Sequence, residues 1–237
     1  MSLLSGVDAV TLDVGGVFVV PNHDRLAAVL AEADLAFDRE RFWDGHYRAM
    51  HAVDSARSAA ESFQDYVPAF CHHLGFHDDE HGRAVEAVGA LFGPSGLWTE
   101  PIAESAIGIR ALDEAGVAMA IVSNADGTVA DVLRDADVCQ EGDGPLVRVA
   151  AVVDSGVIGI AKPHPAIFTP ALEALGTAPE RTLHVGDSVH YDVEGARAAG
   201  LQAVHFDPRR LCPSDEHGHV RALTDLIGPI DPGPAVD

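Results

Sequence analysis

The hydrophobic pattern alternates between two kinds of segment along most of the chain. Short apolar runs bounded by turn-forming residues are typical of buried strands, and they occur at residues 7–12, 117–122, 147–153, 183–185 and 202–206. Segments with helical spacing lie between them, at residues 101–115, 127–135, 165–175 and 191–199. We also expect a short return strand at 157–160 and a short helix at 220–227. Strands that alternate with helices predict a doubly wound, mainly parallel α/β sheet.

The pattern after the first strand is different. Residues 24–92 show only helical patterns, with helices expected at 42–60, 63–74 and 83–92. Asn22 is expected to cap the first helix of this block. The chain is therefore predicted to have a core of residues 1–22 and 97–237 and a helical insertion of residues 23–96. Residues 228–237, rich in Pro, Gly and Asp, are expected to fray.

Composition and charge limit the classes of partner. The chain has 237 residues, 47% of them hydrophobic, and a formal net charge of -22. Such a charge repels nucleic acid and anionic membranes, so neither is an expected partner. No apolar run approaches the ~18 residues of a membrane span, and the first residues lack a signal pattern, so a cytoplasmic protein is expected. Cys71, Cys139 and Cys212 form no CxxC pair, which argues against a disulfide framework or a thiol zinc site.

A carboxylate follows the first predicted strand. Asp13 comes directly after that apolar run and is followed by Gly15 and Gly16. In open α/β sheets, ligands bind at the carboxyl ends of the strands. Glycines there let the backbone pass close to a ligand. Asp13 is therefore a candidate nucleophile, although an ordinary turn residue has the same local pattern.

Three later stretches add polar groups at comparable places. Ser123 and Asn124 end a second apolar run, Lys162 precedes a helix that starts with proline, and Asp187, Ser188 and Asp192 follow the strand at 183–185. Lys162 is the only lysine of the chain; the other 14 basic residues are arginines. A lysine ammonium is a compact positive charge that can offset charge on a phosphoryl group during transfer.

These stretches, in this order, resemble the haloacid dehalogenase-like (HAD) superfamily of hydrolases. The most specific elements are Lys162-Pro-x-Pro-x-Ile-Phe168 and Gly186-Asp187-Ser188 with Asp192 four residues later, and the likeness spans about residues 7–208. It implies a Rossmann-like core whose helical insertion is a cap. It also implies Mg²⁺ held by the Asp13 carboxylate, the Gly15 carbonyl and Asp187. For Asp192 it leaves three roles open: a direct ligand, a ligand through water, or a partner of Lys162.

The resemblance further implies a Mg²⁺-dependent phosphatase that acts on a small phosphorylated metabolite through an aspartyl-phosphate on Asp13. Ser123 and the Asn124 backbone would bind phosphate oxygens beside Lys162. The chain departs from the family pattern at Gly15, where phosphatases usually carry a second Asp. That residue protonates the leaving group and activates water, which is worth typically ~10²–10⁴-fold. Slow turnover or a substitute acid is therefore expected, with His23, Asp24, His46 and His51 as the candidates.

Other functions are weighed against the phosphatase. A phosphometabolite-binding protein with weak or no catalysis is supported by Gly15. A haloacid dehalogenase needs no metal, so the acids at Asp187 and Asp192 argue against it. A C–P hydrolase of the family needs a cap lysine, and residues 23–96 contain none.

The cap is expected to select the substrate through residues on or near one helix, namely His46, Tyr47, His51, Ser55 and Arg57. Zinc binding is not expected at the other histidine-rich places, which are His72, His73, His77 and His81, and His217 with His219. The identity of the substrate and the oligomeric state are left open.

Overall fold

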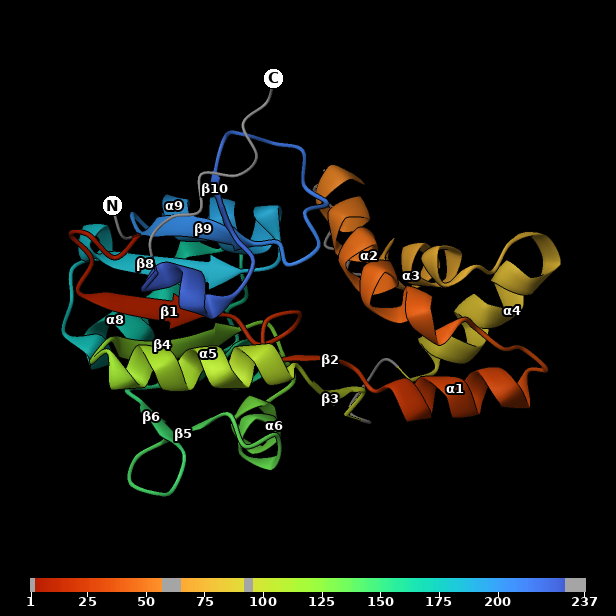
Figure 1. Ribbon diagram of the computed structural model, residues 1–237, viewed down its shortest axis with the longest axis horizontal. Helices are drawn as coiled ribbons and strands as arrows, with labels where there is room; N and C mark the ends of the chain where they lie inside the picture. The colour runs from red at the N-terminus through yellow and green to blue at the C-terminus, as the bar shows by residue number, and fades with distance from the viewer. Residues whose placement is uncertain (1–2, 57–64, 92–95, 229–237) are drawn as a thin grey trace.

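The computed structural model describes residues 3–56, 65–91 and 96–228. Its centre is a sheet of six parallel strands in the order β10-β9-β8-β1-β4-β7 (Figure 1). The strands are β1 (Ala9–Leu12), β4 (Ala118–Ser123), β7 (Val152–Asp154), β8 (Thr182–Gly186), β9 (Gln202–Phe206) and β10 (Gly218–Val220). The parallel α/β core predicted from the alternating pattern is confirmed.

The central strand β1 sets the position of the strand ends. It is fully buried and pairs with β4 on one side and β8 on the other. Leu12 lies in register with Ile121 and with Val185. The residues that follow these three positions therefore meet at one edge of the sheet.

Helices cover both faces of the sheet. On β4, Met119 and Ile121 pack into one apolar cluster, whereas Ala120 and Val122 pack into another, as the two-residue period of a strand requires. The first cluster includes side chains of α5 (Ala103–Glu114), α6 (Val129–Asp135) and η6 (Leu223–Leu226). The second includes side chains of η3 (Pro165–Phe168), α8 (Thr169–Leu175) and α9 (Gly195–Ala198). The doubly wound arrangement is thus a consequence of strands that are apolar on both faces.

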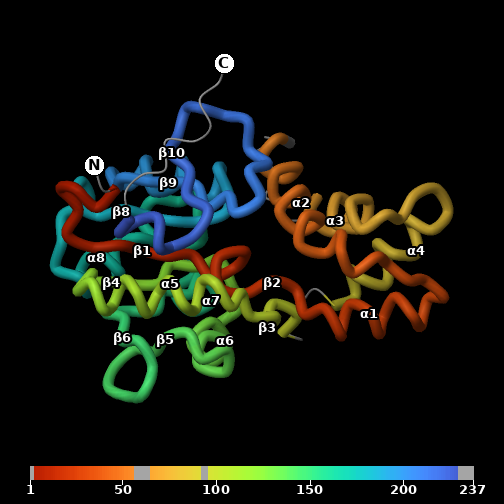
Figure 2. The backbone as a smooth tube through the Cα atoms, viewed as in Figure 1, coloured from red at the N-terminus to blue at the C-terminus, as the bar shows by residue number. Residues whose placement is uncertain are grey.

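A separate group of helices follows β1. It comprises α1 (His23–Glu32), η1 (Arg39–Arg41), α2 (Phe42–Ala56), α3 (Tyr66–Leu74) and α4 (Asp78–Gly89). These helices lie beside the sheet in Figures 1 and 2 and have their own apolar core, which includes Leu30, Phe42 and Phe70. The antiparallel pair β2 (Val19–Pro21) and β3 (Trp98–Pro101) connects them to the core. The division into two domains at residues 22–23 and 96–97 stays a prediction.

Local hydrogen bonds explain several differences from the sequence pattern. The Asn22 side chain accepts a hydrogen bond from Arg25 N, so the predicted cap of α1 is confirmed. The return strand expected at 157–160 is wrong: Ser155–Ile158 form the short helix α7, because Asp154 caps Gly156 N and Gly159 ends the helix in a left-handed conformation.

Other strands lie where the pattern predicts helix or one longer strand. The run at 147–153 is divided between β6 (Val147–Val149) and β7, and β6 pairs with β5 (Cys139–Glu141), which was not predicted. Residues 98–101 pair with β2, so the next helix starts at Ala103. The helix expected at 220–227 is replaced by β10 and η6. Strand pairing is a long-range contact, which local periodicity does not contain.

Two further short helical turns lie before and after β8. They are the 3-10 turn η4 (Pro179–Arg181) and the π-helical turn η5 (Val189–Glu194). The predicted helix ends between residues 57 and 64 lie outside the described residues. Within residues 3–56, 65–91 and 96–228, no helix has both the length and the apolar character needed to cross a membrane.

Candidate active site

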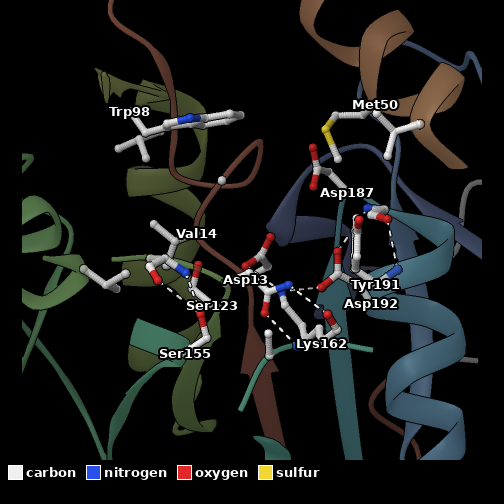
Figure 3. Close-up of a pocket in the computed structure, with 18 of the residues that line it drawn as sticks. Asp13, Val14, Met50, Trp98, Ser123, Ser155, Lys162, Asp187, Tyr191 and Asp192 are labelled. Carbon is white, nitrogen blue, oxygen red and sulfur yellow. Dashed lines mark hydrogen bonds and ion pairs between the residues drawn. The ribbon is translucent and has the colours of Figure 1, made fainter. Parts of the chain in front are cut away.

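The polar residues predicted from the strand ends gather on the floor of one cavity. Asp13 follows β1, Ser123 ends β4, and Asp187 follows β8. Lys162 reaches them from the segment before η3, and Asp192 from η5. All five side chains are buried, and all line a cavity of about 1120 Å³ (Figure 3). The sequence prediction that these residues lie together is therefore met by the structure, while their catalytic roles stay predictions.

Lys162 links two of the carboxylates. Its Nζ atom lies 2.7 Å from Asp13 Oδ1 and 2.6 Å from Asp192 Oδ1. Asp192 is held from its other side by His184 Nε2 at 3.0 Å and by the Ser188 backbone N–H, which donates to Oδ2 at 3.0 Å. Of the three roles left open for Asp192, partner of Lys162 agrees best with these contacts.

His184 is itself fixed by a buried neighbour. A carboxylate only accepts hydrogen bonds, so His184 Nε2 is the donor to Asp192. The other ring nitrogen, Nδ1, lies 2.9 Å from the Thr11 hydroxyl. The order Thr11–His184–Asp192–Lys162 is a continuous chain of buried contacts that fixes the ammonium group beside Asp13.

Burial and neighbouring charges move the pKa values of this cluster in opposite directions. Burial raises the pKa of Asp13, and the positive charge of Lys162 offsets this only in part. Burial raises the pKa of Asp187 well above its usual range, and the nearby carboxylates of Asp13 and Asp192 add to the shift. For Asp192, burial is outweighed by the Lys162 ammonium, so its pKa lies below the ordinary value. Burial also opposes the charge on Lys162, but the two carboxylates prevail and raise its pKa.

The cluster fits a hard divalent cation. Carboxylate oxygens of Asp13, Asp187 and Asp192 lie within 4.8 Å of one another. Asp187 Oδ2 is buried and has no hydrogen-bond partner among the described residues. With the three carboxylates ionised, Lys162 leaves two formal negative charges in a buried place. Mg²⁺ prefers such oxygen ligands and would balance that charge.

Two glycines allow the acids to come so close. A Cβ atom at Gly16, whose φ is +66°, would lie 1.9 Å from Asp187 Oδ2. A Cβ atom at Gly186 would lie 2.1 Å from the Asp192 carboxyl carbon. Neither position therefore tolerates a side chain without displacing a carboxylate of the cluster.

Ser123 and Asn124, at the end of β4, have different surroundings. Ser123 is only 4% exposed and lines the cavity. The Asn124 side chain accepts a hydrogen bond from Lys162 N at 2.7 Å and donates one to Lys162 O at 2.9 Å. Asn124 thus positions the Lys162 backbone, a contact that the sequence did not predict.

Two side chains of helix α2 contact Asp187 and the loop after Asp13. His46 is fully buried, and its Nε2 atom lies 3.5 Å from Asp187 Oδ2. Its Nδ1 atom lies 2.8 Å from the Tyr66 hydroxyl. Burial lowers the pKa of His46 to about 3, so the ring is neutral near pH 7. The Tyr47 hydroxyl donates to the Gly16 carbonyl at 2.8 Å, which anchors the same helix to the loop after Asp13.

No candidate for the missing acid lines the large cavity among the described residues. His46 faces Asp187, and His23 and Asp24 contact Arg39 at the surface. His51 lines a smaller cavity. Over Gly15, where the usual second Asp would stand, a Cβ atom would lie 3.4 Å from the Trp98 ring.

An aspartate that the sequence analysis did not single out connects the helices to the core. Asp54 of α2 accepts hydrogen bonds from Ser188 Oγ at 2.6 Å, Val189 N at 2.8 Å and His190 N at 3.0 Å. Asp54 lies seven residues after Tyr47, a spacing that places both near one face of a helix. The sequence pattern led instead to its neighbour Ser55, which is exposed. Met50 and Val53 of the same helix also line the cavity. Arg57 lies outside the described residues.

The histidines between residues 72 and 81 do not have the geometry of a metal site. His72 has ring contacts with His73, His77 and His81, and His81 Nε2 lies 2.9 Å from the Pro68 carbonyl. In the part of the chain that the structure describes, these four are not among the groups whose ligand atoms converge for a metal.

Comparison with known proteins finds a family and several relatives that this chain resembles. The family model of haloacid dehalogenase-like hydrolases matches residues 7–200. Phosphoserine phosphatase of Thermus thermophilus is 43% identical over 100 residues, which are 42% of this chain and 37% of that protein. Haloacid dehalogenase-like hydrolase domain-containing protein 3 of Bos taurus is 35% identical over 140 residues, 59% of this chain and 53% of that protein. These matches span roughly a third to a half of the relatives' length.

Solved structures share the fold over almost the whole chain. The magnesium-bound HAD-hydrolase YfnB of Bacillus subtilis has a TM-score of 0.59 at 18% identity, covering 93% of this chain and 96% of that one. A 2-haloacid dehalogenase of Pseudomonas syringae has a TM-score of 0.53 at 20% identity, with the same coverage. Because phosphatases and dehalogenases share this fold, function depends on the site.

Proposed function

Because the chain belongs to the haloacid dehalogenase-like hydrolase family, we propose that it is a magnesium-dependent phosphatase that hydrolyses small phosphate esters through Asp13. The observation that carries the proposal is the buried cluster of Asp13, Lys162 and Asp187 on the floor of one cavity. The relatives named as phosphatases agree with it. With Mg²⁺ bound, the charges of the ion and of Lys162 would balance the three carboxylates, so the site could accept a substrate that is itself an anion.

Asp13 is the nucleophile in this proposal. One of its carboxylate oxygens attacks phosphorus, and the bond between phosphorus and the ester oxygen breaks with its electron pair on the leaving alcohol. Water then attacks the phosphorus of the aspartyl-phosphate, the bond to the Asp13 oxygen breaks, and phosphate and a free carboxylate are formed. Lys162 and Ser123 contact the phosphate oxygens and stabilise the charge that moves onto them.

The proposed metal ligands are those that the family resemblance implies, and the approach of the Asp13 and Asp187 carboxylates supports them. The Asp13 carboxylate, the Gly15 carbonyl and Asp187 would hold Mg²⁺, with Asp192 fixing Lys162 beside them. When bound, Mg²⁺ supplies the positive charge that lets an anionic nucleophile approach an anionic phosphoryl group. His46 stays neutral and orients the Asp187 carboxylate, and is therefore a positioning residue. The helices α1 to α4 act as the cap, which covers the site through Met50 and Val53 of α2, with Trp98 of β3 beside them.

Gly15 carries no proton, and none of the four candidate acids, His23, Asp24, His46 and His51, lines the cavity. We therefore expect turnover to depend steeply on the acidity of the leaving alcohol, so that phenyl or acyl phosphates react much faster than alkyl phosphates. This expectation distinguishes the chain from phosphatases that have the second Asp.

The decisive experiment is hydrolysis of p-nitrophenyl phosphate with Mg²⁺ by the native chain and by Asp13→Asn. The native chain should turn over, and the variant should lose at least about 10³-fold in kcat, because the nucleophile is removed. Asp126→Asn is the matched control, since Asp126 lines the same cavity outside the cluster. It should retain activity.

Two results would contradict the proposal. Equal inactivity of the native chain and Asp13→Asn over a broad panel of esters, with phosphate binding intact, would favour the phosphometabolite-binding protein. Release of halide from 2-haloacids without Mg²⁺ would favour the dehalogenase.

A further inference from the structure

A second group of metal-ligating side chains lies at the edge of the sheet, outside the catalytic cluster. It consists of His205, Cys212, His217 and His219, and one ligand atom of each lies within 4.8 Å of the others. His205 and His219 stand opposite each other on β9 and β10. His217 lies in the bend just before β10, and the centroid of its ring is 4.7 Å from that of His219. Cys212 comes from the connection between the two strands.

We infer that these four side chains form a structural zinc site. Three imidazoles and one thiolate are ligands that Zn²⁺ prefers, and four protein ligands close a tetrahedral site without leaving an open position for catalysis. Mg²⁺ prefers oxygen ligands, so the two sites select different metals. The inference does not depend on the phosphatase proposal.

His205 offers a nitrogen that nothing in the described structure satisfies. The side chain is 6% exposed, and its Nε2 atom lies 2.9 Å from the Asp187 backbone carbonyl. A carbonyl only accepts, so Nε2 carries the proton and Nδ1 keeps its lone pair. That Nδ1 atom is buried and has no hydrogen-bond partner among the described residues. A metal-bound histidine typically donates its other N–H to such a carbonyl.

The other ligands are oriented in the same way. His219 Nε2 lies 2.9 Å from the Ser214 carbonyl, so it too donates there, and its Nδ1 atom lies 3.6 Å from Asp207 Oδ2. His217 Nε2 lies 3.5 Å from Cys212 Sγ. Zinc bonds of ~2.3 Å to sulfur and ~2.0–2.1 Å to nitrogen, at a tetrahedral angle, place those two atoms about 3.6 Å apart.

A buried carboxylate supports the thiol ligand. Asp207 accepts hydrogen bonds from Leu211 N at 2.9 Å and from Cys212 N at 3.0 Å. These bonds fix the turn that presents the Cys212 side chain to the histidines. The absence of a CxxC pair argued against a thiol zinc site, but here the ligands come from two strands and their connection.

Zinc at this place would also stabilise contacts that the connection 207–217 makes with helix α2 and that His205 makes with Asp187. The connection 207–217 extends from β9 to helix α2 before it returns to β10 (Figures 1 and 2), and its Arg209 lies 3.2 Å from Asp44 of α2. On the other side, His205 holds the backbone of Asp187. Zinc at this place would thus stabilise both the contact between the helices and the sheet and one acid of the catalytic cluster.

The test measures metal binding directly. Metal-stripped protein is titrated with Zn²⁺ in excess Mg²⁺, and separately with Co²⁺, whose bond to a thiolate gives a charge-transfer band in the near ultraviolet. One zinc per chain and a cobalt–thiolate band are expected, because no cysteine is among the residues that line the large cavity. Cys212→Ser should lose the band and at least about 100-fold in zinc affinity. His77→Ala, a change in the other histidine group, should behave like the native chain.

A thermal measurement keeps the inference falsifiable if Cys212→Ser folds poorly. His219→Ala alters an exposed ligand and should fold, yet it should also lose zinc affinity. Zinc at about 100 times its Kd should raise the Tm of the native chain and of His77→Ala by about 5–10 °C, but not that of His219→Ala. Absence of zinc binding in the native chain, or native zinc binding in both ligand variants, would overturn the inference.

Discussion

At the scale of single residues, Gly16 determines how closely the catalytic acids approach each other. Its φ of +66° is left-handed, and a Cβ atom there would lie 1.9 Å from Asp187 Oδ2. Gly16→Ala should therefore displace the Asp187 carboxylate and reduce Mg²⁺-dependent turnover by at least about 100-fold, since displacements near 1 Å cost that much.

Gly176→Ala is the control for Gly16→Ala. Gly176 also has a φ of +66°, but nothing lies within 4 Å of its Cβ position. Both variants should lose a similar ~1–2 kcal/mol of stability from the left-handed backbone, measured by urea denaturation. Only Gly16→Ala should lose turnover; an equal loss in both would show that backbone strain, rather than the contact with Asp187, is responsible.

Gly15 is expected to limit the rate with poor leaving groups. Gly15→Asp would place an acid where phosphatases of the family carry one, and should raise kcat for alkyl phosphates by about 10-fold or more. Gly15→Asn has nearly the same shape, presses on Trp98 equally and carries no acidic proton. A gain in both variants, or in neither, would contradict an acid-limited rate.

At the scale of elements, helix α2 is attached to the N-terminal turn of η5 by a single carboxylate. Asp54 accepts hydrogen bonds from Ser188 Oγ, Val189 N and His190 N. Asp54→Ala leaves these donors without their partner and should cost about 1–3 kcal/mol in the free energy of unfolding. It should also raise KM, because α2 carries Met50 and Val53 of the cavity wall.

Asp44→Ala provides the comparison on the same helix. Asp44 forms an exposed ion pair with Arg209, which is worth under about 1 kcal/mol. Urea denaturation and KM measurements on both variants test the role of Asp54. If Asp44→Ala and Asp54→Ala lose the same stability and affinity, the three hydrogen bonds of Asp54 do not hold the helix in place.

The elements also show how far periodicity predicts structure. The strands β1, β4, β8 and β9 were predictable because each contains a short apolar run that is largely buried. The strands β2, β3 and β10 have mixed or proline-containing sequences. The strands β2 and β3 lie far apart in the chain and pair with each other, and β10 pairs with β9 at the edge of the sheet. Such strands depend on tertiary contacts that outweigh local preference.

At the scale of the whole molecule, the formal charge of -22 makes the buried acidic cluster costly without a cation. Burial raises the pKa of Asp187, so the metal-free folded state holds a proton there that the unfolded chain has already released above pH ~3.9. The metal-free protein should therefore lose stability as the pH rises from that value through the raised pKa of Asp187.

Asp187→Asn tests this electrostatic cost. Without metal, the variant should have a higher Tm at pH 7 than the native chain, because folding no longer has to protonate or bury a carboxylate that is ionised in the unfolded chain. Mg²⁺ at about 100 times its Kd should raise the Tm of the native chain by about 5–10 °C and leave the variant unchanged. Thermal melts with and without EDTA measure both effects. A Mg²⁺ effect that persists in the variant would exclude Asp187 as a ligand.

The sequence by itself determined the parallel α/β core, the helical insertion and the main residues of the candidate site. Asp13, Ser123 and Asp187 were predictable because buried strands are apolar runs, and the polar residue that ends each run must lie at the carboxyl edge of the sheet. Lys162 was predictable from its motif before a helix that starts with proline. The family assignment followed from the same positions.

Only the tertiary structure decided which groups meet across long distances in the chain. It brought Asp54 to the start of η5, His46 to Asp187, and His205 to Cys212 and the two later histidines. Such contacts depend on how helices and loops pack on the sheet. A hydrophobic pattern encodes which face of an element is buried, but not which side chain of another element lies against it.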